Sequence, residues 1–365
     1  KVNKLATFHS IVAGAELNAT QFSDAITIPS SEEVVKIILK KAEVGFSPSM
    51  VNTFRECKLQ FYFRYVCGLY DLDEVEESLA KQNKLYDFIL YAAVIMQYYS
   101  LWIFLNSLQA PALSTATIIG RVISMGLLCG SFGINVAHEL GHRVNKMEQT
   151  FAKMLLLTSL YMHFFIEHNK GHHKHVATPN DPSTAKYKQS VYAFWVQTFI
   201  GTYTSAWHIA IDEAKKKNRA LPILNNEMFL FQLIQIGFVL GIFYFFGLSI
   251  MLYFMGAALM GATLLETVNY IEHYGLSREK GEGELYERVK PHHSWNSNHV
   301  IGRLMLFELS RHSDHHYLAS RKYQILRNME EAPQMPTGYP GMIVLSLFPP
   351  IWFSIMHKQM KKYSL

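Results

Sequence analysis

Histidines in a few short segments are the residues of this chain best suited to chemistry. His312, His315 and His316 fall within five residues, and on a helix the i+3 and i+4 spacings place them on one face. His138 and His142 repeat the i, i+4 spacing. A helix face that carries several imidazole nitrogens is suited to hold a metal ion.

Two further segments bring the set to nine histidines. His168 and His172 again stand four residues apart, and the neighbouring His173 is turned about 100° from His172 on a helix of about 3.6 residues per turn. His273 follows in a separate segment. One metal ion takes roughly four to six ligands and the set contains no cysteine, so two ions fit better than one. Imidazole suits Fe, Cu, Ni and Zn alike, which leaves the metal open.

Carboxylates stand beside several of these histidines. Glu139, Glu167, Glu272 and Asp314 each adjoin a proposed ligand, and their oxygens could fix the tautomer of an imidazole. Adjacency in sequence fits a solvated surface carboxylate equally well, because it does not show which way a side chain points.

The composition indicates a membrane protein. Half of the residues are hydrophobic and 17% are charged, against roughly 25% in soluble domains. The net charge of +5 fits basic loops at an anionic membrane face or an acidic protein partner, and it is too diffuse to indicate nucleic acid. Cys57, Cys67 and Cys129 lie far apart, so neither a disulfide framework nor a cysteine-based zinc site is expected.

Four apolar stretches are long enough to cross hydrocarbon, which takes about 20 residues. The uncharged loop of the first pair and the basic residues that follow it place the histidine-bearing ends in the cytoplasm by the positive-inside rule. We therefore predict an all-α integral membrane protein with about four transmembrane helices and a cytoplasmic helical cap that holds a histidine-rich di-metal site. The predicted transmembrane helices are 85–108, 117–137, 228–246 and 250–270, with a tight turn at 247–249.

Three further helical stretches do not fit as additional crossings. Residues 151–166 and 191–211 must start and end on the same side, so we expect interfacial or re-entrant helices. Residues 341–356 are interrupted by Pro349 and Pro350, which predicts an anchor that lies on the membrane.

The first part of the chain differs from the rest. Residues 1–78 form an atypical, polar N-terminal segment, and residues 79–365 form the membrane domain. We expect an amphipathic helix through about residues 47–66, an acidic linker at 71–77, and no cleavable signal peptide. Residues 47–77 resemble a segment of AddB/RecB-type nucleases, but no nuclease motif follows, which favours a foreign or fused segment.

From about residue 78 onwards the chain resembles the membrane-bound alkane 1-monooxygenases, an integral-membrane non-haem di-iron family. The resemblance is carried by five motifs in order: HELGH at 138–142, EHNKGHH at 167–173, NYIEHYGL at 269–276, RHSDHH at 311–316 and PTGYPG at 336–341. Members of that family normally have six transmembrane helices, and the first two have no counterpart before Leu85 in this sequence.

The resemblance implies an enzyme that inserts one oxygen atom of O2 into the terminal C–H bond of a medium-chain n-alkane to give a 1-alkanol. Two non-haem Fe ions would be the cofactors, and electrons would come from rubredoxin, reduced by an NADH-dependent rubredoxin reductase. The enzyme would lie in the cell inner membrane with its metal site on the cytoplasmic side. The implied iron ligands are His138, His142, His168, His172, His173, His273, His312, His315 and His316.

Other residues receive supporting roles. His292, His293 and His299 match family positions that do not bind iron, so we expect them to be structural or to support the ligands from behind. An alkane has no polar group, so its channel must be apolar and open to lipid. Ile134, Leu264 and Leu265 are candidate walls of this channel, although packing alone explains them equally well.

Three alternatives remain open at this stage. His138, Glu139 and His142 also satisfy the H-E-x-x-H pattern of a membrane zinc metalloprotease, which leaves the other histidines unused. A fatty-acyl desaturase or hydroxylase of the same histidine-box superfamily is the second alternative, and an inactive truncated homologue is the third. The basic run 215–219 fits docking of an acidic rubredoxin or a simple topology signal.

Overall fold

The computed structural model describes residues 36–37, 39–40, 72–281 and 285–363. The chain divides into two units, residues 1–82 and 83–365. Within the first unit the structure describes α5, Leu72–Gln82, so the acidic stretch predicted as a linker is largely helical. The helix expected at 47–66 lies outside the described residues, and the foreign origin of residues 1–78 stays a prediction.

All regular elements in the described part of the second unit are helices, which confirms the all-α class. Three helical segments are long and apolar enough to cross a membrane. The first is α6, Lys84–Ser107. The second is a continuous run made of α7, Thr115–Leu128, the π-helix η2, Cys129–Ile134, and α8, Asn135–Gly141. The third is α13, Glu227–His273, and the three segments cover the four predicted crossings except for Leu108.

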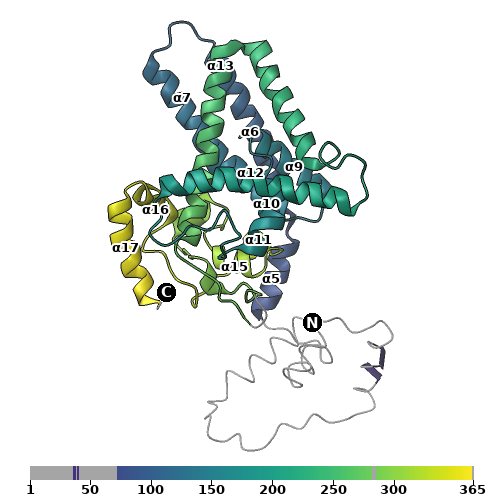
Figure 1. The fold of residues 1–365 in the computed structure, drawn as a ribbon, viewed down its shortest axis with the longest axis vertical. Coiled ribbons are helices and arrows are strands. Elements are labelled where there is room, and N and C mark those ends of the chain that lie inside the picture. The colour runs from purple at the N-terminus through teal and green to yellow at the C-terminus, as the bar shows by residue number, and fades with distance from the viewer. Residues whose placement is uncertain (1–35, 38, 41–71, 282–284, 364–365) are drawn as a thin grey trace, which may run out of the picture. The chain divides into compact units, whose positions relative to one another are not determined.

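The 47-residue α13 is a helical hairpin. Its backbone breaks at Gly247, where φ is 81° and ψ is 172°, a conformation that favours glycine. Rings of Phe238 and Phe254 meet at a centroid distance of 5.7 Å, although residues 16 apart in a straight helix are about 24 Å apart. The chain therefore doubles back at the predicted turn, and α13 consists of two arms that match the two predicted crossings (Figure 1).

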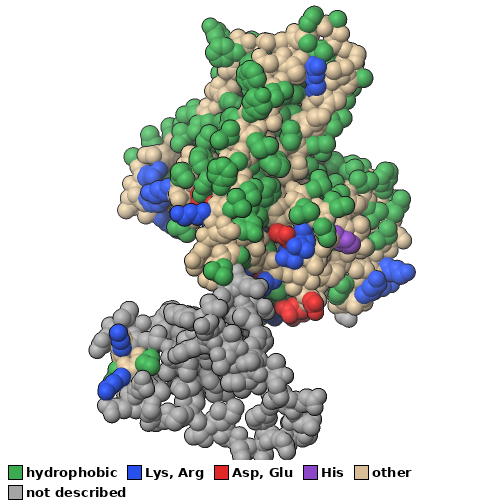
Figure 2. Space-filling model, turned by 180° about the vertical axis from the view of Figure 1, so that it is seen from behind, with side chains coloured by type: hydrophobic (Ala, Val, Ile, Leu, Met, Phe, Trp, Pro, Cys, Tyr) green, Lys and Arg blue, Asp and Glu red, His purple; other side chains and the backbone are tan. Residues whose placement is uncertain are grey.

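Small residues let the two returning helices approach closely. A Cβ atom added to Gly261 of α13 would lie 2.6 Å from Cβ of Cys129 and 3.2 Å from the Gly126 carbonyl oxygen. Close approach at glycine is a common way for membrane helices to pack, because lipid supplies no hydrophobic drive between them. The outer faces of the spanning helices stay apolar, with Ile95 73% and Phe245 73% exposed, and Figure 2 shows many hydrophobic side chains there.

The helix α12, Val191–Lys216, crosses below the spanning helices (Figure 1). It begins at Ser190, whose hydroxyl caps the amide of Ala193. The stretch predicted as a single helix at 151–166 is instead two: α9, Lys146–Leu157, and α10, Phe164–Glu167. They are separated by a turn in which Leu160 has φ 50°. The interfacial position of these elements stays a prediction.

The last helices close the lower part of the unit. α16, Tyr339–Ser346, and α17, Pro349–Lys362, meet at the predicted proline break, since Pro349 and Pro350 begin the second helix. α17 buries Trp352 against Tyr270, so this segment packs on the protein. The short helices are η3, His168–His172; α11, His173–His175; η5, Pro291–His293; α14, Val300–Met305; α15, His312–Tyr317; and η6, Tyr323–Ile325.

Candidate metal centre

The structure gathers all nine predicted histidines into two adjoining groups. Within each group the nitrogens that could bind a metal lie within 4.8 Å of one another. We call them the five-histidine group and the four-histidine group. The five-histidine group contains His138, His142, His168, His173 and His315, and the four-histidine group contains His172, His273, His312 and His316.

Four separate parts of the fold deliver these rings. α8, the last part of the second spanning run, carries His138, and His142 is the first residue after this helix. The return arm of α13 ends at His273, so both hairpins bring histidine to the same level. The remaining rings come from the η3–α11 turn and from α15, which lie beside each other because His315 Nε2 is 3.1 Å from His173 Nε2.

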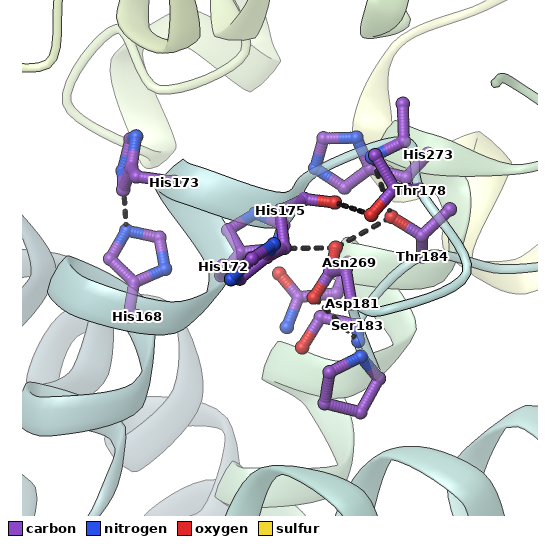
Figure 3. Close-up of polar contacts among 12 residues, drawn as sticks. His168, His172, His173, His175, Thr178, Asp181, Ser183, Thr184, Asn269 and His273 are labelled. Carbon is purple, nitrogen blue, oxygen red and sulfur yellow. Dashed lines mark hydrogen bonds and ion pairs between the residues drawn. The ribbon is translucent and has the colours of Figure 1, made fainter. Parts of the chain in front are cut away.

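Neighbouring histidines are divided between the groups. The sequence spacing predicts that His168 shares a face with His172, but η3 is a π-helix and His173 donates its backbone N–H to the His168 carbonyl, five residues back. His168 therefore faces His173, with Nε2 atoms 3.0 Å apart, and His172 points to the other group (Figure 3). In α15 the predicted pair His312 and His316 does join one group, whereas His315 joins the other. The shared face is therefore wrong for His168 with His172 and for His315, and it holds for His312 with His316.

The nitrogen spacing fits metal coordination. Nε2 of His168 lies 3.1 Å from that of His142 and 3.0 Å from that of His173, which in turn lies 3.1 Å from that of His315. One ring in this chain of four would have to donate a single N–H to two acceptors. A metal–nitrogen bond of about 2.1 Å instead puts ligands at right angles about 3 Å apart. In the four-histidine group the His312–His273 and His172–His316 Nε2 pairs lie 3.1 and 3.2 Å apart.

Burial favours the neutral form of His142, His315 and His316, which leaves their nitrogens able to donate a lone pair. It lowers the pKa of His142 to about 3. Burial likewise lowers the pKa of His315 and His316 well below the ordinary value, and nearby histidines add to the effect. Metal binding requires neutral imidazole, so these rings need not lose a proton before they bind a metal.

Asp181 supports the four-histidine group and was not anticipated. Its Oδ2 lies 2.9 Å from Nδ1 of His172 and accepts a hydrogen bond of 2.6 Å from Thr184 (Figure 3). Burial alone raises the pKa of this carboxyl, but His172 and the Thr184 hydroxyl outweigh it, so the pKa is lowered. Asp181 lies nine residues after His172, in a turn rather than on a helix face, so helical spacing gave no signal for it.

The four predicted supporting carboxylates have different surroundings. Glu272 Oε1 lies 3.2 Å from Nδ1 of His312 and accepts a 2.7 Å hydrogen bond from Tyr339. Glu167 is buried, one of its oxygens has no partner among the described residues, and burial together with Asp181 and Glu266 raises its pKa well above the usual value.

The other two carboxylates pair with arginines. Glu139 accepts a 2.6 Å hydrogen bond from Arg143, and Asp314 accepts one of 2.9 Å from Arg327. The expectation that these two carboxylates contact an imidazole is therefore wrong, because each contacts an arginine instead. An arginine within reach offers a charged donor to a buried carboxylate, which compensates its lost hydration.

An apolar cavity of about 300 Å³ reaches the histidines. His138, His168 and His312 form part of its wall, and Leu264 and Leu265 line it as predicted. Ile134 does not line it but packs, fully buried, in the neighbouring core. The π-helix η2 inserts an extra residue per turn, which shifts the helix register so that Ser131 and Asn135 face the cavity.

The three histidines expected to play no part in iron binding lie outside the two groups. His293 accepts a hydrogen bond at Nδ1 from the backbone N–H of Lys290, and its Nε2 lies 3.1 Å from Glu287. Glu287, His292 and His293 are close enough to hold an ion, but the Lys290 ammonium already pairs with Glu287. His292 and His299 are exposed. A structural role for His293 fits these contacts.

The chain matches known proteins over the part that carries this centre. The family model described as fatty acid desaturase matches residues 112–346. Alkane 1-monooxygenase 1 of Pseudomonas aeruginosa is 44% identical over 247 residues, 67% of this chain and 64% of the relative. Alkane 1-monooxygenase 1 of Alcanivorax borkumensis is 36% identical over 284 residues, 78% of this chain and 70% of the relative.

A xylene/toluene monooxygenase hydroxylase component of Pseudomonas putida is more distant, at 27% identity over 66% of this chain and 64% of that relative. The alignments with the two alkane 1-monooxygenases of Pseudomonas aeruginosa span just under two thirds of those relatives' length, 64% and 65%. The fold, the apolar helices and the histidine clusters define a membrane protein of the desaturase class with a site suited to metal. The chain belongs to the fatty acid desaturase family and, within it, to the alkane 1-monooxygenases.

Proposed function

We propose that this protein is a di-iron monooxygenase that converts a medium-chain n-alkane and O2 to a 1-alkanol. The observation that carries the proposal is the clustering of nine histidines, most of them deeply buried, beside an apolar cavity whose wall includes His138, His168 and His312. The names of the relatives, alkane 1-monooxygenases at 36–44% identity, support the reaction and substrate class.

Each histidine group would hold one iron ion, and the nitrogen spacings near 3 Å fit such binding. When bound, iron supplies the O2 chemistry needed to break a strong C–H bond. The protein's own contribution is to gather the imidazoles, to fix His172 through Asp181, and to exclude water from the neighbouring cavity.

Substrate binding would come from apolar area alone. Leu264, Leu265, Leu306 and Ile343 line the cavity, and each methylene removed from water contributes about 0.8 kcal/mol. Because no charged group is needed to hold an alkane, the substrate can enter from lipid. This binding places a terminal methyl at the wall formed by His138 and neighbouring rings.

Asn135 adds a polar contact inside this cavity. It is 5% exposed, it lines the cavity three residues before His138, and its Nδ2 has no hydrogen-bond partner among the described residues. A buried donor without a partner costs free energy. We assign it the task of donating to the oxygen of the product alcohol, which would also orient the carbon that carries it.

Electrons would come from rubredoxin, reduced by an NADH-dependent reductase, as in the family that the motifs resemble. The net charge of +5 suits an acidic donor protein. The proposed location is the cell inner membrane, with the histidines on the cytoplasmic side where soluble electron donors reach them.

A zinc protease is disfavoured by the contacts of Glu139. A general base must reach the metal-bound water, but Glu139 accepts hydrogen bonds from Arg143 at 2.6 Å and from the backbone N–H of Tyr323 at 3.3 Å. Oε1 of Glu139 already accepts two hydrogen bonds, so this oxygen is not free to act as the general base of a protease.

The test is turnover by purified protein with rubredoxin, its reductase and NADH, followed by gas chromatography. We expect 1-octanol from octane and oxygen consumption matched to it. A product formed only from a fatty acyl substrate would favour the desaturase or hydroxylase alternative. Bound iron without any turnover would favour an inactive homologue.

A further inference from the structure

A basic and apolar corner lies where α12 ends and α13 enters its spanning arm. Lys215, Lys216, Lys217 and Arg219 fall within five residues, and all four are exposed. Figure 2 shows Lys and Arg side chains gathered on the corresponding flank, next to hydrophobic ones. The loop 220–226 then leads directly into the apolar helix.

The corner encloses a pocket of about 630 Å³, which we call the α12–α13 pocket. Lys217, Arg219 and Asn225 line one side of it. Ile166 and Ala210 contribute apolar wall. The pocket therefore combines positive and apolar lining at the level where a polypeptide passes from water to lipid.

The positive charge of the pocket is not cancelled by its own acids. Glu213 is paired with Lys170 at 2.7 Å, and Glu227 is paired with Lys153 at 2.5 Å, both lysines lying on other elements. Lys217 and Arg219 have no acidic partner among the residues that the structure describes, and the Arg219 guanidinium donates a hydrogen bond of 3.3 Å to the Asn225 carbonyl. Two cations thus remain available to an anion.

Exposed apolar side chains continue from the pocket along the membrane helix. Leu221 is 70% and Leu224 53% exposed in the loop, and Leu230 and Leu233 are each 53% exposed on the first turns of α13. Leu224, Leu230 and Leu233 also line the pocket. A ligand that fits this order has an anionic head followed by hydrocarbon.

We propose that the α12–α13 pocket binds an anionic phospholipid, with the headgroup phosphate between Lys217 and Arg219 and an acyl chain along Leu230 and Leu233. Basic residues next to a spanning helix attract anionic lipid, and a pocket adds a defined place for the phosphate. This inference is independent of turnover.

Bound lipid would also support the metal centre. Ile166 forms part of the pocket wall and lies two residues before His168, while Lys170 of η3 pairs with Glu213 at the pocket. A ligand that binds only the folded protein raises its unfolding temperature. Anionic lipid should therefore stabilise the segment that carries His168.

The experiment is native mass spectrometry of the full chain in neutral detergent, with phosphatidylglycerol and phosphatidylcholine supplied separately. The wild-type protein should retain phosphatidylglycerol more strongly. The double variant Lys217→Gln, Arg219→Gln should bind it roughly thirtyfold more weakly, as loss of two surface cations predicts. The control Lys361→Gln, Lys362→Gln removes the same charge from the end of α17 and should bind as wild type does.

A second readout is the unfolding temperature with each lipid. Phosphatidylglycerol should raise it for the wild-type and control proteins but not for the Lys217 and Arg219 variant. Equal retention of both lipids, or unchanged retention in the variant, would overturn the proposal. If the variant instead loses only salt-dependent reduction by rubredoxin, the corner is a protein-docking surface and the lipid proposal is wrong.

Discussion

The two histidine groups differ in what supports their rings. In the four-histidine group, His172 lies beside Asp181 and His312 lies beside Glu272. Among the described residues, the five-histidine group has no ring hydrogen-bonded to a carboxylate, and its rings meet one another instead. The four-histidine group thus combines four imidazoles with two nearby carboxylates, whereas the five-histidine group has a fifth imidazole.

This difference teaches how two cations could be held side by side. Carboxylates that contact ligating imidazoles raise their basicity and add negative charge near the ion. A fifth imidazole adds a ligand but no charge. We therefore expect the four-histidine group to depend on each of its ligands and on Asp181, and the five-histidine group to tolerate the loss of a ring better.

Removing a ring from each group gives the largest expected contrast. His312→Ala leaves three imidazoles in its group, so iron content should fall by about half and turnover should be lost. His142→Ala leaves four imidazoles, so it should retain more iron. Iron per chain, measured by plasma emission on both purified variants, checks this. Equal iron loss in the two would break the comparison.

Asp181→Asn tests the acidic support directly. The variant keeps the shape of the side chain but loses the charge beside His172. Its affinity for the ion of the four-histidine group should fall about 10- to 100-fold. Chelator competition measures this affinity. Asp212→Asn, at an exposed residue of α12, is the matched control and should leave it unchanged.

Acid should lower the stability of the metal-free protein, because both groups contain buried histidines with lowered pKa values. The pKa of His142 is lowered to about 3, whereas an unfolded histidine titrates near 6.5. Between these values the unfolded chain binds more protons, so stability falls as pH falls below about 6.5 and is constant above it. At pH 5 one such imidazole costs about 2 kcal/mol. Unfolding temperatures of chelated protein from pH 5 to 8 would show this, and a flat profile would contradict it.

Asn135→Leu should have the smallest effect. Asn135 shares a helix with His138 of the five-histidine group but holds no ligand position. We expect full iron content and a kcat about tenfold lower, the value of one lost hydrogen bond. Loss of iron in this variant would show that Asn135 supports the metal site instead.

The sequence predicted the membrane hairpins well because lipid imposes a simple rule. The lengths of the apolar stretches predicted the helices and the turn at Gly247. They also predicted that His138 and His273 lie at the same end of these helices. It also identified the nine histidines that the structure gathers, while their role as iron ligands stays a prediction.

The division of the rings between two groups could not be read from helical spacing. A π-helix has no sequence signature in the i, i+4 pattern, so the partner of His168 was misassigned. Of the two roles left open for Ile134, channel wall and core packing, the structure shows core packing. Glu139 and Asp314 bind arginines and not histidines, because adjacency in sequence does not determine which way a side chain points. Asp181 was missed because a turn, not a helix, brings it to His172.

The most direct test of the account is a metal count on purified, unmodified protein. We expect two irons per chain. The X-ray absorption spectrum should show mainly nitrogen ligands around iron. The His312→Ala variant should retain only one of the two irons. A single bound metal, or zinc in place of iron at full occupancy, would contradict it.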